Sequence, residues 1–140
     1  MQGIKPLEYK KGPMSNSGLK YFTPAEAVKT LPLVKKIVSD ILGCGIKIRR
    51  IISSLDGNIE DNAGVQKLIV EMDSYIEELK EIGCLYKDWN FSIGLVDFPA
   101  IIEDKEVYLC WRSDEKEINY YHGINDGYAG RKIIPEHYFK

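Results

Sequence analysis

The sequence has few of the residues from which disulfide frameworks and thiolate metal sites are built. Its 140 residues include three cysteines and two histidines. Cys44, Cys84 and Cys110 are odd in number, widely spaced and without a CxxC pair, so they predict neither a disulfide framework nor a thiolate zinc site. We expect reduced, buried thiols in a cytoplasmic protein.

Two further absences narrow the class of protein. No stretch approaches the roughly 20 apolar residues of a membrane helix, and the N-terminus lacks the hydrophobic run of a signal peptide. Positive charge is not in excess, because 19 Lys and Arg stand against 21 Asp and Glu. The Lys47–Arg50 cluster and the aromatic Tyr120–His122 run would suit RNA, but this acidic balance disfavours nucleic acid. Because the sequence has neither a membrane helix nor a signal peptide, we expect no membrane association.

The chain is long enough for one domain with a real core and too short for two. Residues 1–19 mix Gly, Pro, Ser and Lys without an apolar period, which predicts a disordered tail. Met14 is an alternative start, so whether residues 1–13 belong to the native protein stays open. Residues 20–140 should form a single α+β domain, with a helical hairpin at about 24–83 and a β-meander at about 84–131.

A strong helix start lies near the beginning of this domain. Thr23, Pro24 and Glu26 supply an N-cap hydroxyl, a first-turn proline and a capping-box glutamate. Pro32 should kink or split the helix near residues 30–31, so that a short helix leads into a long one.

Two apolar stripes with spacings of three and four then predict an antiparallel helical hairpin. They consist of Val34, Val38, Ile41, Gly45, Ile48 and Ile52, and of Val65, Leu68, Met72, Tyr75, Leu79 and Ile82. Turn-forming residues at 53–62 separate the helices, and Gly83 should end the second. Additional apolar residues on the first helix predict a second neighbour, either the sheet or another copy of the protein. Gly43 and Gly45 indicate close backbone packing or, as the alternative, a hinge.

After the hairpin the pattern alternates, as in β-strands. We predict strands at 84–87, 94–102, 106–112 and 117–122, hence a small three- to four-stranded antiparallel meander packed on the helical hairpin. A two-residue tip at Asp104–Lys105 would set Phe98 opposite Trp111 and Asp97 opposite Arg112. A loop at 113–116 would then set Trp111 opposite Ile118, Leu109 opposite Tyr120 and Tyr108 opposite Tyr121.

The two faces of this sheet should differ. The inner, apolar face would carry Val96, Phe98, Ala100, Ile102, Val107, Leu109, Trp111, Ile118 and Tyr120. The outer face would carry Asp97, Tyr108, Cys110, Arg112, Glu117, Asn119 and Tyr121. A functional site should be sought on the outer face, because it gathers polar groups and aromatics. An ordinary cross-strand ladder of Asp97, Arg112 and Glu117 is the simpler interpretation.

In this register His122 lies on the face opposite to Cys110. The sequence therefore predicts no metal site, no cofactor and no Cys–His nucleophile pair. The loop at 125–131 holds two glycines, a tyrosine and Arg131, which would suit a phosphate or carboxylate ligand. A plain turn with Arg131 in a salt bridge to a neighbouring acid is the favoured interpretation.

Several motifs resemble the prokaryotic domain-of-unknown-function family 2203 over about Tyr21 to Arg131. The matching segments are Phe22–Thr23, Glu26–Ala27, Leu31–Pro32, GLVDFPA at 94–100, VYLCWR at 107–112, Glu115, His122 and GYAGR at 127–131. The DFPA and LCWR segments are the most specific. Asp114 and Tyr121 stand where the family pattern has glycine and tryptophan. The resemblance implies no reaction, because the activity of the family is unassigned.

The function we expect is that of a non-enzymatic binding or accessory module acting through a protein partner or as a homodimer. The alternative is an anion-binding protein or an enzyme with a polar site on the outer sheet face, with no catalytic residue assigned. The candidate residues for such a site are Asp97, Arg112, Glu115, His122, Asp126 and Arg131.

Overall fold

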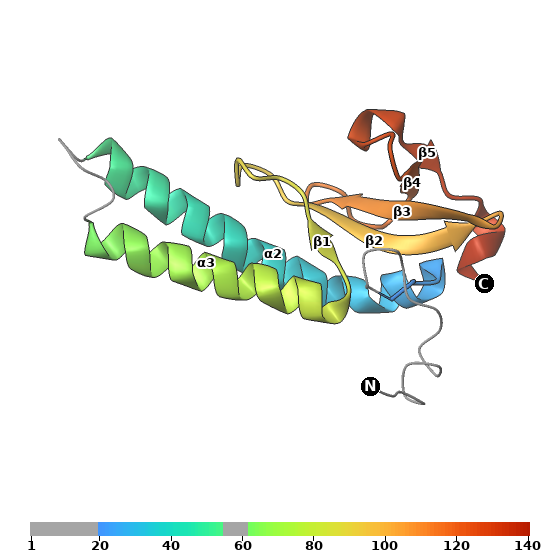
Figure 1. The fold of residues 1–140 in the computed structure, drawn as a ribbon, viewed down its shortest axis with the longest axis horizontal. Coiled ribbons are helices and arrows are strands. Elements are labelled where there is room, and N and C mark those ends of the chain that lie inside the picture. Colours follow the sequence, from blue (N-terminus) through green and yellow to red (C-terminus); the bar gives the residue numbers. More distant parts are fainter. Residues whose placement is uncertain (1–19, 55–61) are drawn as a thin grey trace.

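The computed structural model of the protein describes residues 20–54 and 62–140. Two long helices, α2 (Pro24–Ser53) and α3 (Ala63–Ile82), form an antiparallel hairpin. A sheet packs on the end of this hairpin at which α2 begins and α3 ends (Figure 1). The predicted α+β class is confirmed. The predicted tail at 1–19 and most of the predicted turn at 53–62 lie outside the described residues. Neither α2 nor α3 is apolar enough over a sufficient length to span a bilayer.

Helix α2 begins as predicted. Thr23 Oγ1 accepts a hydrogen bond from Glu26 N at 3.0 Å, and Thr23 N donates to Glu26 Oε1 at 2.9 Å. The predicted split at residues 30–31 is wrong, because α2 continues through Pro32. Pro32 lies on the exposed side of the helix, so water can hydrate the backbone carbonyl that its missing N–H leaves free.

Helix α3 has two defined ends. The side chain of Asn62 accepts a hydrogen bond from Val65 N at 2.9 Å, and Gly83 ends the helix with a left-handed φ of 109°. Between them, Val65, Met72 and Leu79 are buried, and Met72 and Leu79 belong to the core cluster that includes α2 residues.

The predicted second neighbour of α2 is the sheet. A Cβ atom on Gly94, just before the second strand, would collide with Val38 of α2. One core cluster joins α2 residues such as Ile37 and Ile41 to the sheet residues Phe98 and Trp111.

The sheet has five strands rather than three or four, all antiparallel and in sequence order. They are β1 (Leu85–Tyr86), β2 (Leu95–Ile102), β3 (Lys105–Arg112), β4 (Tyr120–Gly123) and β5 (Lys132–Ile133). Two short 3₁₀ helices, Tyr128–Gly130 and Glu136–Phe139, flank β5.

The predicted β2–β3 register is wrong by two residues. Phe98 lies opposite Leu109, and Asp97 lies opposite Cys110. The cause is the hairpin tip: Glu103 and Asp104, with φ of 53° and 64°, are the turn residues. Because side chains alternate with a period of two, this shift changes partners and leaves each residue on its predicted face.

The predicted β3–β4 register is wrong by one residue, which reverses the faces of β4. Leu109 lies opposite Tyr121, and Cys110 lies opposite Tyr120. Glu115 ends the β3–β4 pairing early, because its Oε1 accepts the backbone N–H of Arg112 at 2.8 Å. Tyr121 therefore packs against the core cluster, and Tyr120 and His122 lie on the outer face with Cys110.

Candidate functional site

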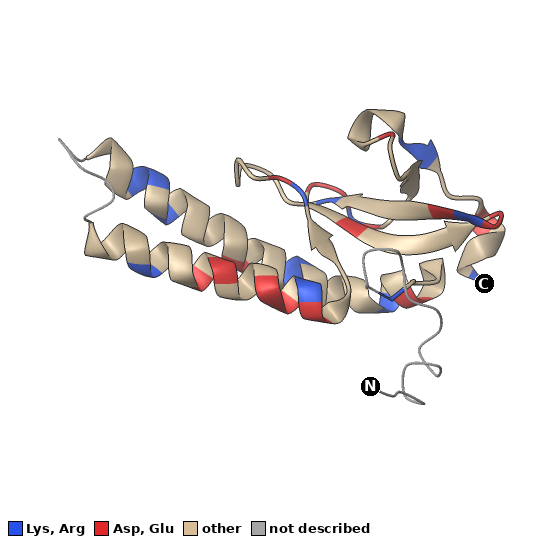
Figure 2. Cartoon of the chain, viewed as in Figure 1, with Lys and Arg blue, Asp and Glu red and all other residues tan. Residues whose placement is uncertain are grey.

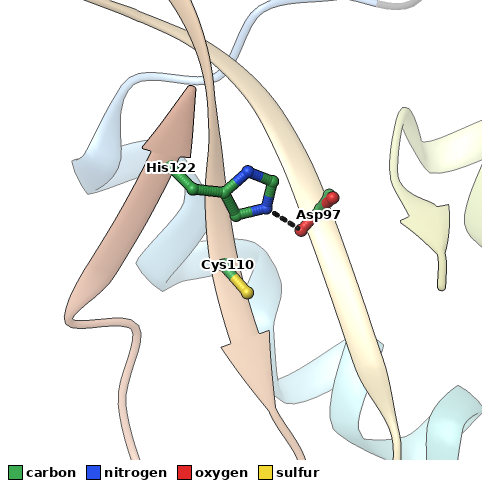
Figure 3. A group of neighbouring side chains, drawn as sticks. All are labelled: Asp97, Cys110 and His122. Atoms are coloured by element: carbon green, nitrogen blue, oxygen red, sulfur yellow. Dashed lines mark hydrogen bonds and ion pairs between the residues drawn. The ribbon is translucent and has the colours of Figure 1, made fainter. Parts of the chain in front are cut away.

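Three neighbouring strands bring Asp97, Cys110 and His122 together on the outer face of the sheet. Asp97 of β2 lies directly opposite Cys110 of β3. His122 of β4 lies two pairs further along, opposite Tyr108 and therefore on the same face. Figure 3 shows the carboxylate, thiol and imidazole pointing toward one another. One carboxylate oxygen, Sγ and one ring nitrogen all lie within 4.8 Å of each other. Asp97 is 3% exposed and His122 is 4% exposed.

Hydrogen bonding fixes the orientation of the His122 ring. Its Nδ1 lies 2.9 Å from the carbonyl oxygen of Gly123, so Nδ1–H is the donor there. Nε2 lies 3.3 Å from Asp97 Oδ1. The Asp97 carboxylate, and after it the Cys110 side chain, raise the pKa of His122 to about 10. The raised pKa favours the protonated form of the His122 ring beside the Asp97 carboxylate.

The arrangement differs from that of a cysteine nucleophile with its base. In such a relay the two imidazole nitrogens serve different partners, the thiol and the orienting carboxylate. Here Nε2 faces the Asp97 carboxylate and Nδ1 is occupied by the backbone carbonyl of Gly123, so neither ring nitrogen serves the Cys110 thiol alone. Cys110 is also fully buried. Convergence of three donor atoms on one point is instead the requirement for holding a metal ion.

Our reason for predicting no metal site was wrong. It placed His122 on the face opposite to Cys110, and the one-residue shift of β4 places both on the same face. An imidazole, a thiol and a carboxylate are together the ligand types of zinc-class metals.

A second cluster lies beside the first and is centred on Arg131. Its Nη2 donates to Glu115 Oε1 at 2.7 Å and Oε2 at 2.8 Å, and also to the Cys110 carbonyl at 3.3 Å. The guanidinium lies over the rings of Tyr120, at 4.1 Å, and Tyr128, at 4.6 Å. The turn with a salt-bridged Arg131 is thus the arrangement found, although Arg131 Nε is buried without a partner.

Arg112 has different partners from those predicted. Its Nε and Nη2 donate to the Asp114 carboxylate at 2.7 and 2.5 Å, and Nη1 donates to the Tyr128 hydroxyl at 2.8 Å. The predicted pairing of Asp97 with Arg112 is therefore wrong, as is the ladder that included Glu117. The guanidinium of Arg112 lowers the pKa of Asp114.

Asp126 shapes the turn that leads to Arg131. A Cβ atom on Gly123 would lie 2.6 Å from Asp126 Oδ2, and one on Gly130 would lie 2.6 Å from Asp126 Cβ. The absence of a side chain at Gly123 and Gly130 therefore leaves room for the Asp126 side chain to pack against its own turn. Asp126 thus has a structural role in this turn.

The sequence model of a family described as an uncharacterized conserved protein (DUF2203) matches residues 20–134. The chain belongs to the DUF2203 family. The matched region includes both helices, the five strands and both polar clusters, so the predicted resemblance is confirmed. No curated protein and no solved structure matches the chain. The description of the DUF2203 family names no reaction, so function has to be argued from the site.

Of the six predicted site residues, the structure joins His122 with Asp97 and Arg131 with Glu115. The six candidate residues of this DUF2203 chain left out four members of the two clusters: Cys110, Asp114, Tyr120 and Tyr128. Cys110 had been placed on the outer face and set aside as a metal ligand. Cys110 and His122 differ by an even number of residues but lie on different strands, so only the length of the intervening loop could have placed them on one face. The sequence does not give that length.

Proposed function

We propose that this DUF2203 protein is a non-enzymatic binding module whose ligand site is the outer face of the sheet. The observation that carries the proposal is the burial of Asp97 and His122 beside Cys110. Removing an ionised pair from water costs several kcal/mol per ion, and apolar side chains would cover this part of the sheet at a lower cost. A site for a ligand accounts for the polar cluster.

Binding is better supported than catalysis. The Cys110 thiol has no solvent exposure, so it is poorly placed to attack a substrate. The two arginines that would bind an anion already have carboxylate partners, Glu115 for Arg131 and Asp114 for Arg112. Among the described residues, a cavity of about 720 Å³ lies between α2 and residues 116–119, and one of about 620 Å³ lies between α2, Trp111 and residues 113–116. Neither cavity is lined by Asp97, Cys110 or His122.

Native mass spectrometry on protein purified gently from its own host tests this proposal. We expect a mass in excess of the 16.0 kDa chain that is lost in Asp97→Asn and retained in Asp73→Asn, at an exposed position on α3. Both substitutions remove one carboxylate charge, and only the first lies in the buried cluster. A bare chain mass, or equal loss in both variants, would contradict a ligand site on the outer face.

Self-association through the helical hairpin is a second candidate, and the specific observation in its favour is exposed apolar surface. Val70 on α3 is 68% exposed and Ile46 on α2 is 45% exposed. Figure 2 shows acidic residues along the middle of α3 and basic residues toward the far end of α2, so two hairpins could pair with complementary charge. Light scattering across a concentration series tests it. A homodimer that Val70→Glu converts to a monomer is expected, and a monomer at all concentrations would contradict it.

We further propose a cytoplasmic location. The three unpaired cysteines support it, because compartments that oxidise thiols favour disulfides. Nucleic acid is the least supported partner, since the long face of α3 is acidic.

A further inference from the structure

We infer that Asp97, Cys110 and His122 form a binding site for a divalent transition metal ion of the zinc class. The inference rests on the proposed function in one respect, because it places the ligand on the outer face of the sheet.

The donor set selects the class of metal. Zinc and similar ions accept imidazole nitrogen, thiolate sulfur and carboxylate oxygen in one site. Calcium and magnesium prefer oxygen ligands, so the thiolate of Cys110 disfavours them. The metal would take the place of the protons on Cys110 and on Nε2 of His122, because ligands bind in their deprotonated forms.

The separation of the donor atoms fits a metal better than it fits an ion pair alone. A charge-assisted hydrogen bond between nitrogen and a carboxylate is typically about 2.7–2.9 Å long. The distance from His122 Nε2 to Asp97 Oδ1 is 3.3 Å. Two such ligands of a tetrahedral zinc ion lie about 3.4 Å apart, as follows from metal–ligand distances near 2.1 Å.

The thiol needs only a small adjustment to join them. Tetrahedral geometry requires a sulfur-to-nitrogen distance of about 3.6 Å, and the three donor atoms already lie within 4.8 Å of one another. Because 4.8 Å is the upper limit of their separation, these donor atoms have to approach by no more than about 1 Å to reach tetrahedral geometry.

The hydrogen-bond partner of the other His122 ring nitrogen is already in place. Metal-binding histidines usually donate their other ring N–H to a carbonyl or carboxylate, which fixes the tautomer and aims the free nitrogen at the metal. Gly123 O plays this role for His122 Nδ1 at 2.9 Å. The site is also shielded from solvent, since Asp97, Cys110 and His122 are all buried. Three protein ligands leave the fourth tetrahedral position to water.

Titration of the full-length chain with Co²⁺, after treatment with a chelator, tests the site. We expect saturable binding of one Co²⁺ per chain, with the near-ultraviolet charge-transfer absorption of a thiolate ligand and the visible bands of a tetrahedral ion. Zn²⁺ should displace the Co²⁺. Cys110→Ser should lose the charge-transfer absorption, and His122→Gln should weaken binding by more than about tenfold.

The chain supplies matched controls for the cysteine and histidine ligands. Cys84 is as deeply buried as Cys110, and His137 is the other histidine, exposed near the C-terminus. Cys84→Ser and His137→Gln should bind Co²⁺ as the parent does. Circular dichroism establishes that each variant is folded, and the titration of the parent chain requires no variant at all.

The outcomes separate the metal site from the wider proposal. The metal site is overturned if the parent chain shows no saturable Co²⁺ binding. It is also overturned if Cys84→Ser loses Co²⁺ binding as much as Cys110→Ser does. If native mass spectrometry nevertheless detects an organic ligand that Asp97→Asn displaces, the outer face is a binding site for another class of ligand. A chain that binds neither metal nor organic ligand overturns both.

Discussion

Arg131 binds both carboxylate oxygens of Glu115, at 2.7 and 2.8 Å, across a gap of 16 residues. Their side chains are only 11% and 20% exposed, which places this pair among the better shielded charges of the protein. Glu115 also accepts the backbone N–H of Arg112, and its carbonyl accepts the indole N–H of Trp111. One residue thus joins the end of β3 to the C-terminal turn.

Glu115→Ala should therefore be strongly destabilising. The substitution leaves Arg131 without its partner in a poorly hydrated position and frees the N–H of Arg112, so we expect a loss of about 2–4 kcal/mol in the free energy of unfolding. Urea denaturation followed by circular dichroism measures it. Glu117→Ala, at an exposed neighbour, should change stability by less than about 0.5 kcal/mol. Similar losses in the two variants would show that the Arg131–Glu115 ion pair contributes no more to the free energy of unfolding than an exposed glutamate does.

Gly43 and Gly45 should respond in opposite ways to alanine. A Cβ atom at position 43 meets nothing within 4 Å, whereas one at position 45 would lie 3.0 Å from Phe91 Cβ and 3.2 Å from Phe91 O. Gly43→Ala should thus stabilise the protein by about 0.5–1 kcal/mol through helix propensity. Gly45→Ala should destabilise it, because the backbone at Phe91 must move. Thermal melts of both variants distinguish this close packing from a hinge, for which both alanines would act alike.

The thiol of Cys84 should make stability fall at alkaline pH. Burial raises the pKa of this group to about 12, from an ordinary value near 9. Between these values the unfolded chain loses the thiol proton and the folded chain keeps it, so the unfolded state binds fewer protons. The free energy of unfolding should then decrease by up to about 1.4 kcal/mol per pH unit as the pH rises above 9.

Cys84→Ala removes the thiol, and with it this difference in bound protons between the folded and unfolded states. Denaturation between pH 8 and 10 should give a shallower decline for the variant than for the parent, whatever the variant costs at pH 8. Tyr86, whose pKa burial also raises, contributes to the decline in both proteins and so cancels from the comparison. Parallel curves would contradict a buried, protonated Cys84.

The two errors of register show which parts of the site could be predicted from the sequence. Alternation along each strand assigned the faces of β2 and β3 correctly, and it would have done so for any even shift. The face of β4 depended instead on how many residues separate it from β3. At that turn the side chain of Glu115 accepts the backbone N–H of Arg112, a local hydrogen bond that the alternation of apolar and polar residues does not encode.

The helices were easier to predict for a physical reason. The capping box at Thr23 and the left-handed stop at Gly83 are local, so the residues that make them are neighbours in sequence. Pro32 is the exception, because its effect depended on which side of α2 faced solvent. Interactions such as that of Arg131 with Tyr120 and Tyr128 depended on a turn geometry that follows from Gly123, Gly130 and the fold of Asp126 between them.

The ion pair of Asp97 with His122 should show strong energetic coupling when no metal is present. Asp97→Asn or His122→Gln alone leaves one buried polar partner unmatched, and we expect each to cost about 3 kcal/mol or more in chelator-treated protein. The double variant should cost less than the sum by about 1–3 kcal/mol, because neither charge is then left alone. Urea denaturation of the four proteins gives this coupling energy. The corresponding cycle of Arg112→Gln and Asp114→Asn, in which both side chains are much more exposed, should show far weaker coupling. If the two cycles gave equal coupling, burial would not be what distinguishes the Asp97–His122 pair, and the case for a dedicated site on this face would lose its energetic basis.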